Sequence, residues 1–135
     1  MKYRKDYHNW NTLKNILDEI DINIPFTEGE IWWISLGINI GIEIDGKGDS
    51  FERPCIIIRK INKEHAWIVP ITQSGIFKAG IHVSINHPSL SIDSKAIVTQ
   101  FQTISNKRLM SKIGILQVKQ FYEIVRAIKT ILPNT

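Results

Sequence analysis

The sequence predicts a mainly β domain with helices (class α+β), built as a small antiparallel barrel of five or six short strands with a helix at each end. Three observations lead to this expectation. Short runs rich in β-branched and aromatic residues are separated by glycine, proline and asparagine turns. These runs do not alternate with helical segments, as they would in a parallel sheet. Helical spacing of apolar residues occurs only near the two ends of the 135-residue chain.

The first expected element is an amphipathic helix over residues 9–20. Its apolar face is formed by residues three or four positions apart, namely Trp10, Leu13, Leu17 and Ile20. Pro25 ends the helical region, because a residue that precedes proline favours extended geometry. We therefore expect residues 1–27 to form a helical extension and residues 28–135 to form the barrel domain.

From Gly29 onward the apolar spacing changes from helical to alternating. Residues 30–36 predict the first strand of the barrel, and a short strand is expected within the following loop at residues 40–44. The next strand is expected at residues 54–61, and its three consecutive isoleucines predict burial on both faces. Pro54 belongs among its first residues, because proline lacks the N–H that a central ladder needs.

The later elements are shorter or interrupted. Residues 65–72 predict a strand in which Pro70 requires an edge or a bulge, so we expect a bend just before Thr72. The other elements are expected at residues 80–85 (a weak strand), 95–104 (an alternating strand), 112–115 (an extended piece) and 116–132 (a helix that Pro133 ends).

Composition and charge narrow the class of protein. No apolar run approaches the ~20 residues that a membrane span requires. No apolar segment of the length of a signal peptide follows the basic start, so we expect no secretory signal. Cys55 is the only cysteine, which predicts a reducing cytoplasm and a small core residue rather than a nucleophile. The net charge is +4, but residues 1–30 carry an acidic excess of two and residues 31–135 a basic excess of six. This distribution favours a polyanionic partner.

The motifs of several common enzyme classes are missing from the sequence. The histidines are not at metal-ligand spacing and no second cysteine assists them, so no metal is expected; they are His8, His65, His82 and His87. A Gly-x-Ser-x-Gly motif and a phosphate-binding P-loop are both lacking. A serine hydrolase or a nucleotidase is therefore poorly supported.

Arg53 is the candidate anion-binding residue, because it lies where a glycine-bearing loop enters the isoleucine strand. A guanidinium assisted by the hydroxyls of Thr72 and Ser74 can hold a phosphate and stabilise negative charge that grows on it. The amides of Gln100 and Gln102, on one face of the alternating strand, add hydrogen-bonding capacity.

A purely structural interpretation competes with this one. Arg53 could pair with Glu52 or Asp49 at the surface, with Thr72 an ordinary strand residue. Judged from single residues, that interpretation is favoured. The order of the motifs along the chain, in contrast, favours the interpretation of Arg53 as an anion-binding residue.

Five fragments follow one another over residues 28–132: Gly29-Glu30-Ile31-Trp32-Trp33, Arg53-Pro54, Val69-Pro70-Ile71-Thr72, Gln100-x-x-Thr103-Ile104-Ser105-x-Lys107-Arg108-Leu109 and Lys112-Ile113-Gly114. Together they resemble the MazF/PemK toxin family. The resemblance implies an SH3-like or CcdB-like barrel with a C-terminal helix, usually homodimeric. It also implies the toxin of a type II toxin–antitoxin pair, a cytoplasmic endoribonuclease that cuts single-stranded mRNA at specific sequences. Its partners would be RNA and a cognate antitoxin. The N-terminal helix is an extension that smaller members of the family lack.

The resemblance also implies roles for individual residues. The arginine of the Arg-Pro motif and the threonine of the Val-Pro-x-Thr motif serve catalysis in the family, and here they are Arg53 and Thr72. The reaction needs no metal or cofactor: the ribose 2′-hydroxyl attacks the neighbouring phosphorus and leaves a 2′,3′-cyclic phosphate and a 5′-hydroxyl. We expect substrate contacts from Lys47, Phe51, Ser74, Gln100 and Gln102.

One departure leaves the general base open. Family members often have an acidic residue before the glutamine of the late strand and an arginine after it, whereas this chain has Thr99 and Gln102. Glu43, Asp45 or a loop histidine are the candidates that remain. Two other functions stay open: a CcdB-like toxin that binds a protein without chemistry, and a catalytically weakened relative that binds RNA or the antitoxin.

Overall fold

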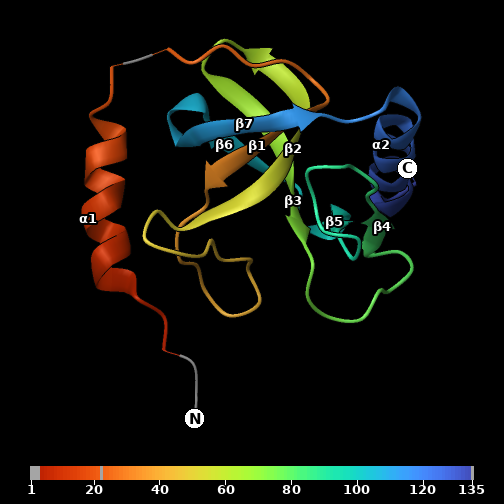
Figure 1. Ribbon diagram of the computed structural model, residues 1–135, viewed down its shortest axis with the longest axis horizontal. Coiled ribbons are helices and arrows are strands. Elements are labelled where there is room, and N and C mark those ends of the chain that lie inside the picture. The colour runs from red at the N-terminus through yellow and green to blue at the C-terminus, as the bar shows by residue number, and fades with distance from the viewer. Residues whose placement is uncertain (1–3, 22, 135) are drawn as a thin grey trace.

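The computed structural model describes residues 4–21 and 23–134, and its strands form a bent antiparallel sheet with a helix at each end of the chain (Figure 1). The elements are α1 (Tyr7–Asp18), β1 (Glu30–Ser35), β2 (Glu52–Asn62), β3 (His65–Thr72), β4 (His82–Ser84), β5 (Lys95–Ile97), β6 (Gln102–Ser105), β7 (Leu109–Ile115) and α2 (Val118–Ile131). The strand order is β4-β5-β3-β2-β1-β7, and β6 pairs with β3. This architecture confirms the predicted fold class.

Strand β3 changes partner half-way along. Residues His65–Ile68 pair with β6, whereas Ile71 and Thr72 pair with β5. Pro70 lies between the two ladders, so its missing N–H removes no hydrogen bond to β6 or to β5. This change of partner lies at the position where we predicted a bend, and it separates Thr72 from the β6 half of the sheet.

Two predicted strands are wrong. Residues 95–104 are not one strand, because a 3-10 turn at Val98–Gln100 divides β5 from β6. Gln100 therefore lies in a turn and Gln102 begins a strand, so regular alternation does not relate their side chains. Residues 40–44 form no strand: the Asn39 Nδ2 donates to the Ile44 carbonyl at 2.7 Å and keeps this segment a loop.

The hydrophobic core lies on both sides of β2. Cys55 and Ile57 pack in one buried cluster, and Ile56 and Ile58 pack in a second that includes Ile124 of α2. The prediction of a strand buried on both faces is confirmed. Cys55 is fully buried, and its burial raises the pKa of its thiol, so it is a core residue as expected.

Helix α1 packs on the body through a third buried cluster that contains Trp10, Leu17, Ile38 and Phe51. The Trp10 and Phe51 rings meet edge to face with centroids 5.7 Å apart. Gly37 is required beneath Trp10: its φ is +80°, and a Cβ at this position would lie 2.1 Å from the indole. α1 and α2 lie on opposite sides of the strands in Figure 1.

A buried carboxylate ties β1 to β7. Glu30 accepts hydrogen bonds from the Thr27 backbone N–H at 2.7 Å and the Trp32 indole at 3.1 Å, and it lies 2.6 Å from the Lys112 ammonium. Burial alone raises the pKa of Glu30, but these three partners outweigh it and place the pKa below its ordinary value of 4.5. The ionised form of Glu30 therefore stabilises the folded state.

Replacing Glu30 by glutamine is expected to lower the free energy of unfolding by about 1–3 kcal/mol near neutral pH. Because the pKa of Glu30 is lower in the folded state than in the unfolded chain, the difference in the free energy of unfolding between wild type and Glu30→Gln should have its full size above pH 4.5. It should shrink as the pH falls through the folded-state pKa of Glu30. Denaturant unfolding across that range measures it. The exposed Glu123→Gln on α2 is the matched control and should leave the free energy of unfolding nearly unchanged. A Glu30→Gln difference that stays constant below pH 4.5 would contradict the assignment.

Candidate active-site cleft

The Arg53 side chain is buried at the start of β2 and is held by backbone carbonyls. The residue is only 8% exposed. Its Nε donates to the Asp45 carbonyl at 2.8 Å, and its Nη1 donates to the Ile71 carbonyl at 3.4 Å. Burial lowers the pKa of the guanidinium, but an arginine stays protonated at physiological pH. Among the described residues Arg53 has no ion-pair partner, so the predicted alternative of a surface pair with Glu52 or Asp49 is not observed.

Thr72 is the last residue of β3 and lies beside Arg53 in the fold. The antiparallel register pairs Cys55 with Pro70, and two further residues in that register set Arg53 opposite Thr72. The Thr72 Oγ1 lies 3.0 Å from the Ser74 hydroxyl and accepts the Ser74 backbone N–H at 3.2 Å. The three predicted residues Arg53, Thr72 and Ser74 therefore lie around one short stretch of β2 and β3.

Arg53 and Thr72 line the same cleft, which has a volume of about 630 Å³. Its walls come from β1, β2, β3 and β7, from the loop between β1 and β2, and from the loop before β5. The other lining residues include Trp33, Lys47, Glu52, Gln73, Ser91 and Ser111. A guanidinium, an ammonium and several hydroxyls in one cleft suit a phosphodiester.

A second cleft, of about 830 Å³, lies on the other side of Arg53 and Lys47. It is formed between the N-terminal arm and the loop from β1 to β2. Arg53, Lys47 and Gly48 line both clefts, so the wall that the clefts share carries two cations.

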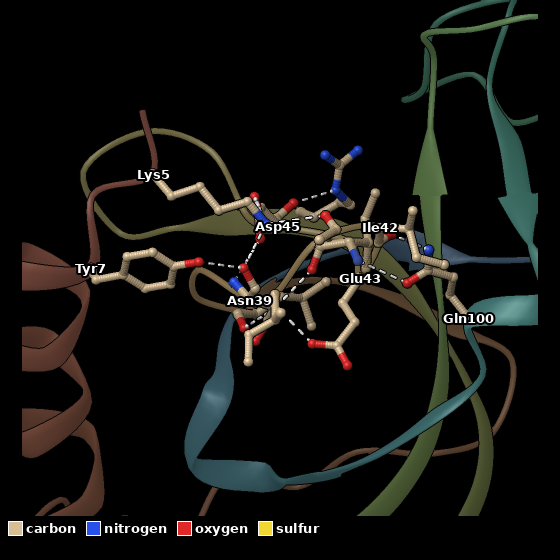
Figure 2. Close-up of polar contacts among 12 residues, drawn as sticks. Lys5, Tyr7, Asn39, Ile42, Glu43, Asp45 and Gln100 are labelled. Carbon is tan, nitrogen blue, oxygen red and sulfur yellow. Dashed lines mark hydrogen bonds and ion pairs between the residues drawn. The ribbon is translucent and has the colours of Figure 1, made fainter. Parts of the chain in front are cut away.

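Three predicted substrate-binding residues do not line the cleft that contains Arg53 and Thr72. The Gln100 amide holds the loop from β1 to β2: its Oε1 accepts the Ile44 N–H at 2.8 Å, and its Nε2 donates to the Ile42 carbonyl at 2.9 Å (Figure 2). The Gln102 Nε2 donates to the Gln100 carbonyl at 3.4 Å. Phe51 is buried against Trp10 and is not exposed for stacking on a base.

The two predicted general bases also have structural partners. The Glu43 carboxylate accepts the Ile40 backbone N–H at 3.0 Å, and the Asp45 carboxylate accepts the Asn39 N–H at 2.7 Å (Figure 2). Asp45 is further paired with the Lys5 ammonium at 3.3 Å. Both carboxylates line the second cleft rather than the cleft that contains Thr72.

Sequence reasoning missed Trp33 and Glu52 as residues of the Arg53 cleft. Trp33 is the exposed member of the otherwise buried β1, and an exposed aromatic on such a strand was the available signal. Glu52 directly precedes Arg53, and from that position we predicted only that it could form an ion pair with Arg53. No group of three or more metal-ligating side chains that could hold an ion occurs within the described residues.

The profile of one protein family, described as PemK-like, MazF-like toxin of type II toxin–antitoxin system, matches residues 27–132. The chain belongs to the PemK/MazF toxin family. The predicted resemblance is thereby confirmed. Helix α1 lies before the matched residues.

Solved PemK/MazF structures have the same fold. An endoribonuclease from a mycobacterial species, in complex with its cognate antitoxin, is 15% identical with a TM-score of 0.62, and the match covers 82% of this chain and 99% of that one. MazF from Deinococcus radiodurans is 10% identical with a TM-score of 0.65, covering 80% and 96%. The Mycobacterium tuberculosis toxin MazF-mt6 is 21% identical with a TM-score of 0.55, covering 75% and 93%. No curated protein sequence matches this chain significantly.

None of the helices in the described residues combines the length and apolar character needed to cross a bilayer.

Proposed function

We propose that this chain is the toxin of a type II toxin–antitoxin pair and that it cleaves single-stranded RNA at the cleft formed by Arg53 and Thr72. The observation that carries the proposal is the buried guanidinium of Arg53. It has no carboxylate partner among the described residues and lies beside a threonine hydroxyl in the same cleft. Family membership and the endoribonucleases among the solved relatives support the same reaction.

The reaction proposed is transesterification. The ribose 2′-oxygen bonds to the adjacent phosphorus as its proton passes to a base, and the bond from phosphorus to the 5′-oxygen breaks as that oxygen takes up a proton. The products are a 2′,3′-cyclic phosphate and a 5′-hydroxyl. Arg53 neutralises the negative charge that builds on the phosphate oxygens, and Thr72 donates a hydrogen bond to one of them. Two of the five guanidinium donors bond to carbonyls, which leaves the others for the phosphate.

Glu52 is the carboxylate that we propose as the general base. It lines the cleft with Arg53 and Thr72, and its carboxylate accepts no hydrogen bond and no ion pair from the described residues. Glu43 and Asp45 are held by backbone N–H groups of their own loop instead. Trp33, in the same cleft, offers a face on which an unstacked base can lie.

The test is RNA cleavage by the purified chain with EDTA present. Cleavage that survives chelation and leaves 2′,3′-cyclic phosphate ends at mapped sites supports the proposal. Intact RNA, together with growth arrest when the chain is expressed in a bacterial host, would favour a toxin that binds a protein without chemistry. Intact RNA with RNA binding retained would favour a catalytically weakened relative.

Replacing Thr72 by valine is expected to slow cleavage by about 10- to 100-fold, because valine keeps the shape of the side chain but removes the donor to the phosphate. Thr72→Ser retains the hydroxyl and is the matched control. Single-turnover cleavage rates of the three proteins measure the effect. Thr72 also accepts the Ser74 N–H, so thermal unfolding must show that the valine variant remains folded. A folded Thr72→Val enzyme with wild-type rates would remove Thr72 from the mechanism.

The proposal includes two protein partners. The basic excess of residues 31–135 suits an antitoxin with an acidic binding segment. A second copy of the chain would cover apolar side chains that stand exposed around the start of α2, namely Ile115, Val118 and Tyr122. Light scattering measures the dimer, and a monomer at high micromolar concentration counts against it.

A further inference from the structure

The loop between β1 and β2, residues 36–51, is held from outside by the N-terminal arm. The Lys5 ammonium donates to the Asn39 and Gly41 carbonyls, the latter at 3.2 Å, and pairs with the Asp45 carboxylate at 3.3 Å (Figure 2). The Tyr7 hydroxyl donates to the Asn39 carbonyl at 3.0 Å. An ammonium has three N–H donors, and Lys5 directs them to three acceptors of one loop.

Asp45 connects this arm to the candidate catalytic residue. Its carboxylate binds Lys5 and the Asn39 N–H, and its own carbonyl accepts the Nε–H of Arg53 at 2.8 Å. The position of the Asp45 peptide therefore sets the position of the guanidinium. The Lys5 and Asp45 side chains are only 18% and 16% exposed, so solvent screens this pair less than a surface ion pair.

The same loop is held on its other side by Gln100, through the Ile42 carbonyl and the Ile44 N–H. The loop is thus fixed at Asn39 and Gly41 by the arm and at Ile42 and Ile44 by Gln100. The Asp45 peptide is also held through the Gly46 N–H, which donates to the Gly37 carbonyl at 2.8 Å, so we expect loss of the arm to loosen the Asp45 carbonyl rather than to release it.

We propose that Lys5 is a positioning residue for Arg53, so that the N-terminal extension forms part of the catalytic apparatus of this toxin. The inference rests on the proposed function of Arg53. Lys5 touches no substrate atom: it fixes the Asp45 carbonyl, which orients the guanidinium towards the cleft shared with Thr72. Because the family match begins at residue 27, this device belongs to the extension and not to the PemK/MazF domain.

The test compares Lys5→Met with Lys5→Arg and with Lys14→Met in the full chain. Methionine keeps the length of the side chain but removes its charge and its N–H donors, whereas arginine keeps the charge and the donors. Lys14 is the control position, because it is exposed on α1 and has no ion pair in the described residues. We expect Lys5→Met to lower kcat for RNA cleavage by about 10- to 100-fold with KM nearly unchanged, because a misplaced catalytic group costs rate rather than ground-state binding. Lys5→Arg and Lys14→Met should both retain wild-type kcat.

A second measurement is independent of activity. The Nε–H signal of Arg53 is identified in heteronuclear NMR spectra by its loss in Arg53→Lys, and its exchange rate with water is then measured. We expect slow exchange in wild type, Lys5→Arg and Lys14→Met, and faster exchange by about 10-fold or more in Lys5→Met as the bond to Asp45 opens more often. Unchanged exchange in Lys5→Met overturns the positioning role, whether or not the chain cleaves RNA. If exchange in Lys5→Met is unchanged but RNA cleavage still depends on Arg53, the role of Lys5 is wrong and the proposed function stands. If wild type cleaves no RNA, the proposed function fails separately.

Discussion

Replacing Arg53 by alanine is expected to slow RNA cleavage by about 10²–10³-fold, the usual cost of removing a donor that stabilises charge in the transition state. The guanidinium sits in a cleft shared with Thr72, with donors remaining beyond those bonded to Asp45 and Ile71. Single-turnover rates on a single-stranded RNA in EDTA measure the loss.

Two further variants make this result specific. Arg53→Lys keeps a positive charge but loses the planar fork, so it should recover only part of the rate. Arg59→Ala removes an exposed arginine from the same strand and should cleave at the wild-type rate. If Arg53→Ala is folded and cleaves as fast as wild type, the cleft is not the site of the reaction. Equal losses in Arg53→Ala and Arg59→Ala would indicate a general electrostatic effect on RNA binding instead.

Replacing Gly46 by alanine is expected to destabilise the fold by about 2–4 kcal/mol and to reduce cleavage as well. A Cβ on Gly46 would lie 1.6 Å from the Phe51 carbonyl oxygen and 2.8 Å from the Glu52 nitrogen, and backbone atoms cannot move aside as a flexible side chain can. The collision lies between Asp45, which holds Arg53, and the start of β2. Denaturant unfolding and cleavage rates together measure the effect.

Gly41 provides the control for Gly46. It has a left-handed φ of +57°, and no atom lies within 4 Å of where its Cβ would be. Asparagine tolerates that conformation, so Gly41→Asn should change stability by less than about 1 kcal/mol. Equal destabilisation by the two substitutions would mean that the loop as a whole, rather than the close approach of Gly46 to Phe51, limits stability.

Local chemistry indicated that Arg53 and Thr72 lie near strand ends, and the order of the motifs, through the resemblance to the PemK/MazF family, indicated that they act together. Proline restricts where a strand can begin and where it must bend, so Pro54 and Pro70 by themselves indicate the start of β2 and the end of β3. Strand pairing then sets the residues before Pro54 and after Pro70 opposite one another. The isoleucine run predicted burial on both faces for the same local reason.

The rest of the site depends on contacts between distant residues, which patterns along the chain do not record. Gln100 binds Ile44 and Ile42 of the loop between β1 and β2, which lie 56 and 58 positions earlier in the chain. The alternating pattern around Gln100 predicted a strand, whereas the residue lies in a 3-10 turn. Glu43 and Asp45 were plausible bases as loop carboxylates, but their neighbours in space are the N–H groups of Ile40 and Asn39. The contact of Lys5 with this loop was equally invisible, because nothing in the first residues indicates where the arm lies.

The acceptors that hold Arg53 are main-chain carbonyls, those of Asp45 and Ile71. Every amino acid supplies such a carbonyl, so substitutions at those two positions do not by themselves delete the acceptor. Mutational sensitivity should therefore concentrate on residues that shape the path of the chain, such as Gly46 and Asn39. Over evolutionary time, neighbours of the guanidinium can change identity while its anchorage persists, provided that the backbone keeps its course.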